Sequence, residues 1–113
     1  MGISETIWSD PIDYLRAVGP NDPVLFMSPA ILQAQAKRFI RGFPGLVTYA
    51  VKSNPEEAVV TNLAAAGITG FDVASPEEIA LIRGLVPDAV LHYNNPVRAR
   101  HEIVFAVGRD VAS

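Results

Sequence analysis

The chain has 113 residues, half of them hydrophobic, with a formal net charge of -3 and no cysteine. This size and hydrophobic fraction fit one small folded domain and disfavour disorder. Because acidic and basic residues are interspersed and cysteine is absent, the composition disfavours nucleic acid or an anionic membrane as partner and excludes disulfides and thiolate metal sites.

Residues 1–23 are interpreted as an N-terminal extension that precedes the first regular pattern. Their start, MGISETIWSDP, has neither the basic nor the apolar region of a signal peptide. No uninterrupted apolar run in the chain reaches membrane-spanning length. We therefore expect a cytoplasmic protein without a membrane partner.

One pattern recurs four times in residues 24–113: an apolar run ends in Ser-Pro or Asn-Pro, and a helix-like segment follows. Ser and Asn side chains accept hydrogen bonds from the free amides of a helix start, and Pro fits the first helical position. Each junction therefore predicts a strand that leads into a helix. The junctions are Ser28-Pro29, Asn54-Pro55, Ser75-Pro76 and Asn95-Pro96.

Four strands and four helices follow from this pattern, and their alternation predicts an α/β fold with a parallel sheet. The expected strands are VLFMS (24–28), LVTYAVK (46–52), GFDVAS (70–75) and VLHYNN (90–95), and the expected helices span about 29–41, 55–66, 76–86 and 96–107.

Large apolar side chains alternate with small or polar ones along the second and third strands. In LVTYAVK the bulk falls at 47, 49 and 51, and the small or polar residues fall at 48, 50 and 52. This pattern favours parallel (β/α) units that form the first part of a TIM-type (β/α)8 barrel, with a site at its C-terminal mouth. A doubly wound open sheet is the alternative, although it would need apolar bulk on both faces.

The barrel is incomplete in this chain, because a (β/α)8 fold takes about 250 residues. Residues 110–113, DVAS, have the composition of a further strand cut off in mid-course. We therefore expect a piece of a larger protein, with a self-contained small domain as the alternative.

Lys52 closes an apolar strand directly before Ser53-Asn54-Pro55, and Lys37 is the only other lysine. Burying the charge of an amine at the C-terminal end of a strand costs free energy. The same end of a barrel strand is where active-site residues lie, so the position suggests a chemical role. The alternative is a lysine that extends from the strand end into solvent.

Three motifs in order, YAVKSNP, GFDVASPEEI and YNNP, resemble the N-terminal half of the barrel in fold type III pyridoxal-phosphate enzymes. The close group is the ornithine and diaminopimelate decarboxylase family, which shares its barrel with alanine racemase. The resemblance covers residues 24–110 and makes 24–113 a partial cofactor-binding barrel. It implies that Lys52 forms the internal aldimine with pyridoxal 5'-phosphate. It also implies that Asp72 lies near the reactive centre and that Ala50 lets the cofactor ring lie close to the strand.

The resemblance further implies part of an amino-acid decarboxylase, a lyase of amino-acid or polyamine metabolism that forms a homodimer when intact. The identity of the amino acid stays open. Other parts of the site come later in the family's sequence, so the activity of this chain alone also stays open. A non-catalytic relative that binds or regulates other proteins, and a half barrel that associates through an exposed strand edge, are the alternatives.

The remaining polar candidates have structural explanations. Ser75 and Glu78 match a capping box, which explains both without a site role. Asn54 and Asn95 are explained as helix caps. His92 is expected to pack or to line the lumen, His101 is expected on the surface, and no spacing of ligand residues predicts a metal site.

Overall fold

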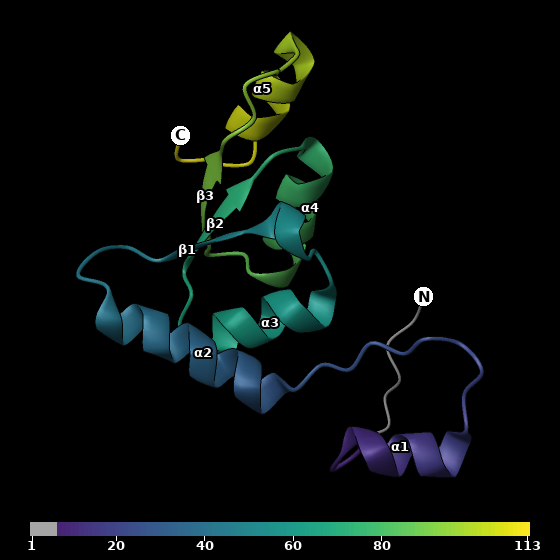
Figure 1. Ribbon diagram of the computed structural model, residues 1–113. Helices are drawn as coiled ribbons and strands as arrows, with labels where there is room; N and C mark the ends of the chain where they lie inside the picture. The colour runs from purple at the N-terminus through teal and green to yellow at the C-terminus, as the bar shows by residue number, and fades with distance from the viewer. Residues whose placement is uncertain (1–6) are drawn as a thin grey trace.

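The computed structural model describes residues 7–113, in which three short parallel strands alternate with helices (Figure 1). The sheet order is β1-β2-β3, and both strand pairs are parallel. The predicted α/β class with parallel (β/α) units is therefore confirmed. The elements are α1 (Pro11–Val18), α2 (Pro29–Gly42), β1 (Thr48–Ala50), the 3-10 turn η1 (Val51–Ser53), α3 (Glu57–Ala65), β2 (Gly70–Val73), α4 (Pro76–Leu85), β3 (Val90–Tyr93) and α5 (Arg100–Val107).

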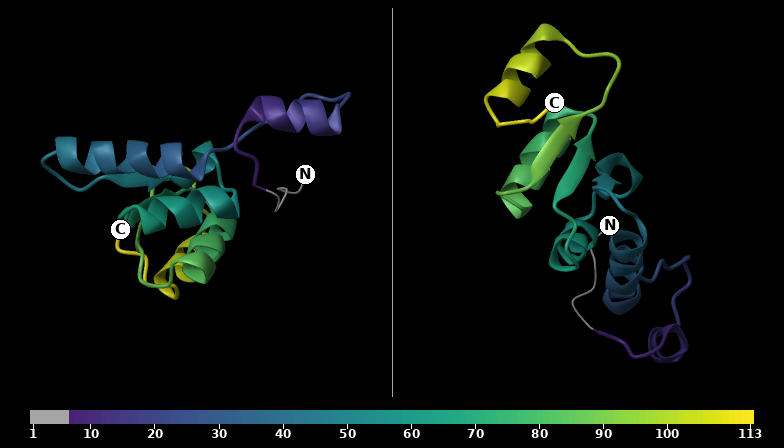
Figure 2. Two further views of the ribbon diagram at one scale, coloured as in Figure 1. Left: turned by 90° about the horizontal axis from the view of Figure 1, so that it is seen from below. Right: turned by 90° about the vertical axis from the view of Figure 1, so that its left-hand side faces the viewer.

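One face of the sheet forms the core with the helices. Phe71, Val73 and Leu91 are fully buried on this face, in one cluster with Ile79 and Ile82 of α4. Each such side chain contributes roughly 1.5–3 kcal/mol by leaving water. The right-hand view of Figure 2 shows β2 and β3 in front of α4, so the helix covers only the rear face of these strands.

The other face, here called the open face, carries the alternate residues of the same strands. Thr48, Ala50, Asp72 and His92 lie on it and remain partly exposed. The register places Ala50 beside Asp72 and Asp72 beside His92. The predicted division between bulky and small or polar positions is thus confirmed for β1 and β2, whereas β3 carries the bulky Val90 in the same phase as His92.

The two Ser-Pro junctions are helix caps, as predicted. Ser28 Oγ accepts a hydrogen bond from the Ile31 amide at 3.2 Å, and Ser75 Oγ accepts one from the Glu78 amide at 3.2 Å. In both helices Pro occupies the first turn. The serine hydroxyls therefore satisfy amides that the helix itself leaves free.

The two Asn-Pro junctions are not caps, which corrects the prediction. Asn54 Oδ1 accepts from the Glu56 amide, and Asn95 Oδ1 accepts from the Val97 amide, each at 3.1 Å. Such two-residue contacts are Asx turns, which fold the loop before a helix. Consequently α3 and α5 begin later than expected, at Glu57 and Arg100.

The predicted strand at residues 24–28 is wrong. This segment is exposed and irregular, and it links α2 to a helix that the sequence patterns did not predict, α1. The Phe26 ring packs edge-on against Tyr14 of α1, with centroids 5.4 Å apart, instead of joining the sheet. Figure 1 shows α1 and this link apart from the three strands.

The last two residues pair with the edge of β3. The Ala112 amide donates to the Leu91 carbonyl at 2.8 Å, and the Tyr93 amide donates to the Ser113 carbonyl at 2.6 Å. Figure 1 accordingly places the C-terminus beside β3. The predicted start of a further strand is therefore present as backbone pairing.

Candidate functional site

Lys52 lies in η1, directly after β1, at the C-terminal edge of the sheet. Its neighbour Val51 is fully buried, which anchors the turn in the core. The Tyr49 hydroxyl donates to the Asn54 carbonyl at 3.1 Å and fixes the chain beyond the turn. The backbone that presents the amine is therefore held on both sides.

The Lys52 side chain itself is exposed, whereas the sequence suggested a costly, sheltered amine. Its ammonium group has no hydrogen-bond partner among residues 7–113. The physical reason is that the open face, toward which β1 presents its small residues, has no cover in this part of the chain. The predicted strand 46–52 ends at Ala50, so Lys52 lies in the turn after the strand, and the described residues do not shelter its side chain.

Asp72 is the best-held polar group on the open face. Thr48 Oγ1 donates to Asp72 Oδ2, and Asn94 Nδ2 donates to Asp72 Oδ1, each at 3.2 Å. The donors come from the two sides of β2, one on β1 and one just beyond β3. Both carboxylate oxygens are thus engaged, and hydrogen bonds to an ionised acceptor are stronger than neutral ones.

Ala50 lies between these groups, because it pairs in register with Asp72 and precedes Lys52 by two residues. Its side chain is a single methyl group, so this part of the open face, beside Asp72 and just before the turn that holds Lys52, carries little bulk. A planar ring can approach such a surface without displacing a side chain. The small residue, the amine and the carboxylate therefore fit a cofactor that has an aldehyde and a flat aromatic ring.

The other sequence candidates have local partners. His92 lies on the open face, with Nδ1 2.6 Å from Ser113 Oγ. The Glu78 carboxylate accepts from the Ser75 hydroxyl at 3.0 Å instead of from the Ser75 amide, so the predicted capping box is only half formed. Asn95 Nδ2 donates to the Ala74 carbonyl at 2.9 Å, which ties the loop after β3 to β2.

Sequence reasoning missed two residues of this site, Thr48 and Asn94. The signal that could have found them is their phase. Thr48 lies on β1 and Asn94 just beyond β3, and both are at open-face positions that flank Asp72.

Two tyrosines point to the helix-covered face and differ in their partners. Tyr49 has the hydrogen bond to the Asn54 carbonyl, and its burial raises its pKa above 10.0. The Tyr93 hydroxyl is buried without a hydrogen-bond partner in the described chain. Burial, with the nearby Glu102 carboxylate, raises the pKa of Tyr93.

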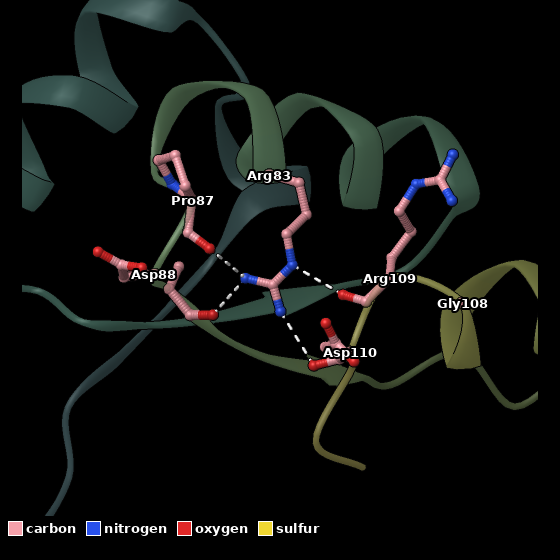
Figure 3. Close-up of a pocket in the computed structure, with 7 residues that line it drawn as sticks. Arg83, Pro87, Asp88, Gly108, Arg109 and Asp110 are labelled. Atoms are coloured by element: carbon pink, nitrogen blue, oxygen red, sulfur yellow. Dashed lines mark hydrogen bonds between the residues drawn. The ribbon is translucent and has the colours of Figure 1, made fainter.

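The hollows of the surface lie at opposite ends of β3. One, of about 280 Å³, lies at the C-terminal end, on the same edge as Lys52. It is lined by Tyr93, Asn94, Asn95, Pro96 and Arg98. The other, of about 300 Å³, lies at the N-terminal end beside Arg83 (Figure 3).

Arg83 lines the second hollow and has a structural role there. Its guanidinium donates to four backbone carbonyls in the loops that precede β3 and follow α5, as the dashed lines in Figure 3 show. A guanidinium has five N–H donors, so little capacity remains for a ligand. The accepting residues are Pro87, Ala89, Arg109 and Asp110.

Metal-binding clusters and membrane-spanning helices are both absent from residues 7–113. Within residues 7–113 no group of three or more His, Asp or Glu side chains is arranged to hold a metal ion. No helix in the same range has the length and apolar character needed to cross a membrane.

Comparison with known proteins points to one family. The pyridoxal-binding domain of the pyridoxal-dependent decarboxylases matches residues 30–113. Ornithine decarboxylase of Rattus norvegicus is 42% identical over 76 residues, which cover 66% of this chain and 16% of that protein. The Panagrellus redivivus enzyme of the same name is 35% identical over 89 residues, 78% of this chain and 20% of that protein.

A third relative, ornithine decarboxylase of Leishmania donovani, is 40% identical over 83 residues, 69% of this chain and 12% of that protein. The chain thus spans no more than about a fifth of the length of these curated relatives. No solved structure matches it significantly.

Proposed function

The chain belongs to the pyridoxal-dependent decarboxylases, as part of their pyridoxal-binding domain, and we propose that the intact protein decarboxylates an amino acid. Pyridoxal 5'-phosphate is the cofactor of this family. When bound, it accepts the electron pair that remains on the α-carbon after loss of carbon dioxide. The relatives named ornithine decarboxylase support ornithine as the first substrate to try.

Lys52 is proposed to carry the cofactor through a covalent bond from Nζ. The observation that supports this role is its place at the C-terminal edge of a parallel sheet, two residues after Ala50. Active sites of (β/α) barrels lie at this edge. The freed amine would also serve to carry a proton to or from the α-carbon.

Asp72 and Ala50 are proposed to act on the cofactor from the sheet. The Asp72 carboxylate, held by Thr48 and Asn94, would supply a fixed negative charge to a cofactor bound on the open face. Ala50 contributes by its lack of bulk, which leaves room for the ring against β1.

We also propose a domain organisation and an assembly for the intact protein. Residues 24–113 would be the first part of the cofactor barrel, and 1–23 an extension. Because Lys52 is exposed among residues 7–113, the proposed role requires cover from outside these residues, and we include a homodimer as one source of that cover. The intact protein is also proposed to be cytoplasmic.

Reductive trapping tests the lysine. The full-length protein, saturated with pyridoxal phosphate, is reduced with borohydride and digested, and the peptides are mapped by mass. We expect a phosphopyridoxyl group on Lys52 and none on Lys37, the exposed lysine of α2 that serves as internal control. An unmodified Lys52 in the saturated protein overturns the assignment.

A further inference from the structure

We propose that Thr48, Asn94 and Gly70 are positioning residues that hold the Asp72 carboxylate in one orientation on the open face. The inference rests on the proposed function, because it concerns how the same site keeps its charge in place. None of the three needs to touch the cofactor. Their effect is exerted through the carboxylate.

Two donors from opposite sides fix the carboxylate. The terminal torsion of an aspartate side chain is broad, so a carboxylate on an uncovered face turns freely. Here Thr48 Oγ1 holds Oδ2 and Asn94 Nδ2 holds Oδ1, each at 3.2 Å. Rotation of the group would break both hydrogen bonds, so the two donors together select one orientation.

The Asn94 end of this arrangement is anchored by backbone pairing. The Asn94 amide donates to the Val73 carbonyl at 2.9 Å, which extends the pairing of β2 and β3 by one residue. The side chain of Asn94 is therefore presented from a fixed backbone, although the residue itself is exposed.

The Thr48 end depends on the absence of a side chain at position 70. Gly70 is the register partner of Thr48, and a Cβ built at Gly70 would lie 2.8 Å from Thr48 Cγ2. Since Thr is stiff about χ1, its methyl group cannot move away without moving the hydroxyl. A methyl group at 70 would therefore turn Thr48 Oγ1 away from Asp72, although residue 70 touches neither the carboxylate nor the lysine.

A fixed carboxylate has a chemical consequence. Charges and dipoles that are already oriented stabilise a developing or bound charge better than groups that must reorganise first. With its orientation set, the Asp72 carboxylate would keep one fixed negative charge on the open face, and this charge would favour a protonated nitrogen between Lys52 and a bound cofactor. If the orientation is lost, that preference weakens.

The test is a pH titration of the visible absorbance of the bound cofactor in the full-length protein. Asp72→Asn is the reference and should move the titration midpoint to lower pH, because it removes the negative charge. We expect Thr48→Val, Asn94→Ala and Gly70→Ala to move it the same way, each by about 0.3 pH unit or more, a twofold change in proton affinity. Thr48→Ser keeps the hydroxyl and should stay at the wild-type midpoint.

The outcomes separate the two proposals. If Lys52 carries the cofactor but Thr48→Val and Asn94→Ala keep the wild-type midpoint, or move it upward, the positioning role is wrong and the proposed function stands. If borohydride leaves Lys52 unmodified in the wild type, the proposed function itself fails. A purely structural role would lower stability without moving the midpoint. Because Asn94 is exposed, the Asn94→Ala variant should fold. Its titration midpoint therefore tests the positioning role even if the Thr48→Val variant fails to fold.

Discussion

The two faces of the sheet differ although the same strands form them. On the helix-covered face Phe71, Val73 and Leu91 are fully buried and apolar. On the open face Thr48 and Asp72 are partly exposed and joined by a hydrogen bond. A period of two along each strand therefore separates the residues that stabilise the fold from the residues that are available for chemistry.

Lys52→Ala should give the largest effect of the variants below. It should lower catalytic activity and leave stability unchanged. Loss of the amine removes the cofactor bond and the proton carrier, so decarboxylation in the full-length protein should fall about 100-fold or more. Because Lys52 is exposed, the free energy of unfolding should hardly change. Carbon dioxide release and denaturant titration measure the two effects. Lys37→Ala is the control, and an equal loss of activity in that variant would contradict the comparison.

Phe71→Ala should show the opposite pattern. Removing this fully buried ring should lower the free energy of unfolding by about 3–5 kcal/mol. Thr48 lies on the open face, opposite Gly70, the residue before Phe71. Thr48→Ser should change the free energy of unfolding by about 0.5 kcal/mol or less. Denaturant unfolding measures both, and a Phe71→Ala variant as stable as Thr48→Ser would remove the distinction between the faces.

Arg83→Met tests whether the N-terminal end of the sheet is structural. The change leaves four carbonyls without their donor and should cost about 2 kcal/mol of stability, with activity per folded molecule retained. Arg38→Met, at an exposed position of α2, is the matched control. Activity that falls further than the folded fraction would place Arg83 in the site.

The two tyrosines sharpen the comparison within the helix-covered face. Tyr49→Phe removes a hydrogen bond to the Asn54 carbonyl and should cost about 1 kcal/mol of stability. Tyr93→Phe removes a buried hydroxyl without a partner in the described chain and should stabilise by about 1 kcal/mol. Thermal or denaturant unfolding of the two variants should therefore shift in opposite directions.

The same tyrosines predict a small effect of high pH. Both have a folded-state pKa raised above 10.0, chiefly by burial. As the pH rises, the tyrosines of the unfolded chain therefore lose their protons before those of the folded chain. The contribution of the two protonated tyrosines to the free energy of unfolding is complete below about pH 10. It is lost as the pH rises through their folded-state pKa values. Tyr93→Phe should reduce this loss, and an unchanged pH dependence in that variant would contradict the assignment.

Sequence reasoning predicted the regular parts of this molecule from local signals. Ser28 and Ser75 mark true helix starts because a hydroxyl can reach the third amide ahead. Asn54 and Asn95 were misjudged, since an asparagine side chain also bonds the second amide ahead and folds a turn instead. The run at 24–28 has strand composition, but its Phe26 packs on α1, a choice that depends on tertiary contacts.

The candidate site was predictable in part for the same reason. Alternation along the strands predicted the faces of Ala50 and Asp72, which are register partners, because side-chain phase is a local property; Lys52 lies in the turn after β1. The pairing of Thr48 and Asn94 with Asp72 was not predicted, since it depends on the register between strands. The exposure of Lys52 depends on what covers the open face, and strand phase carries no information about that cover.

A crystal structure of the full-length protein with bound pyridoxal phosphate tests the central claim most directly. The account predicts continuous density from Lys52 Nζ to the cofactor, the ring lying against Ala50, and Asp72 still held by Thr48 and Asn94. A cofactor bound at another lysine, or on the helix-covered side of the sheet, would contradict it.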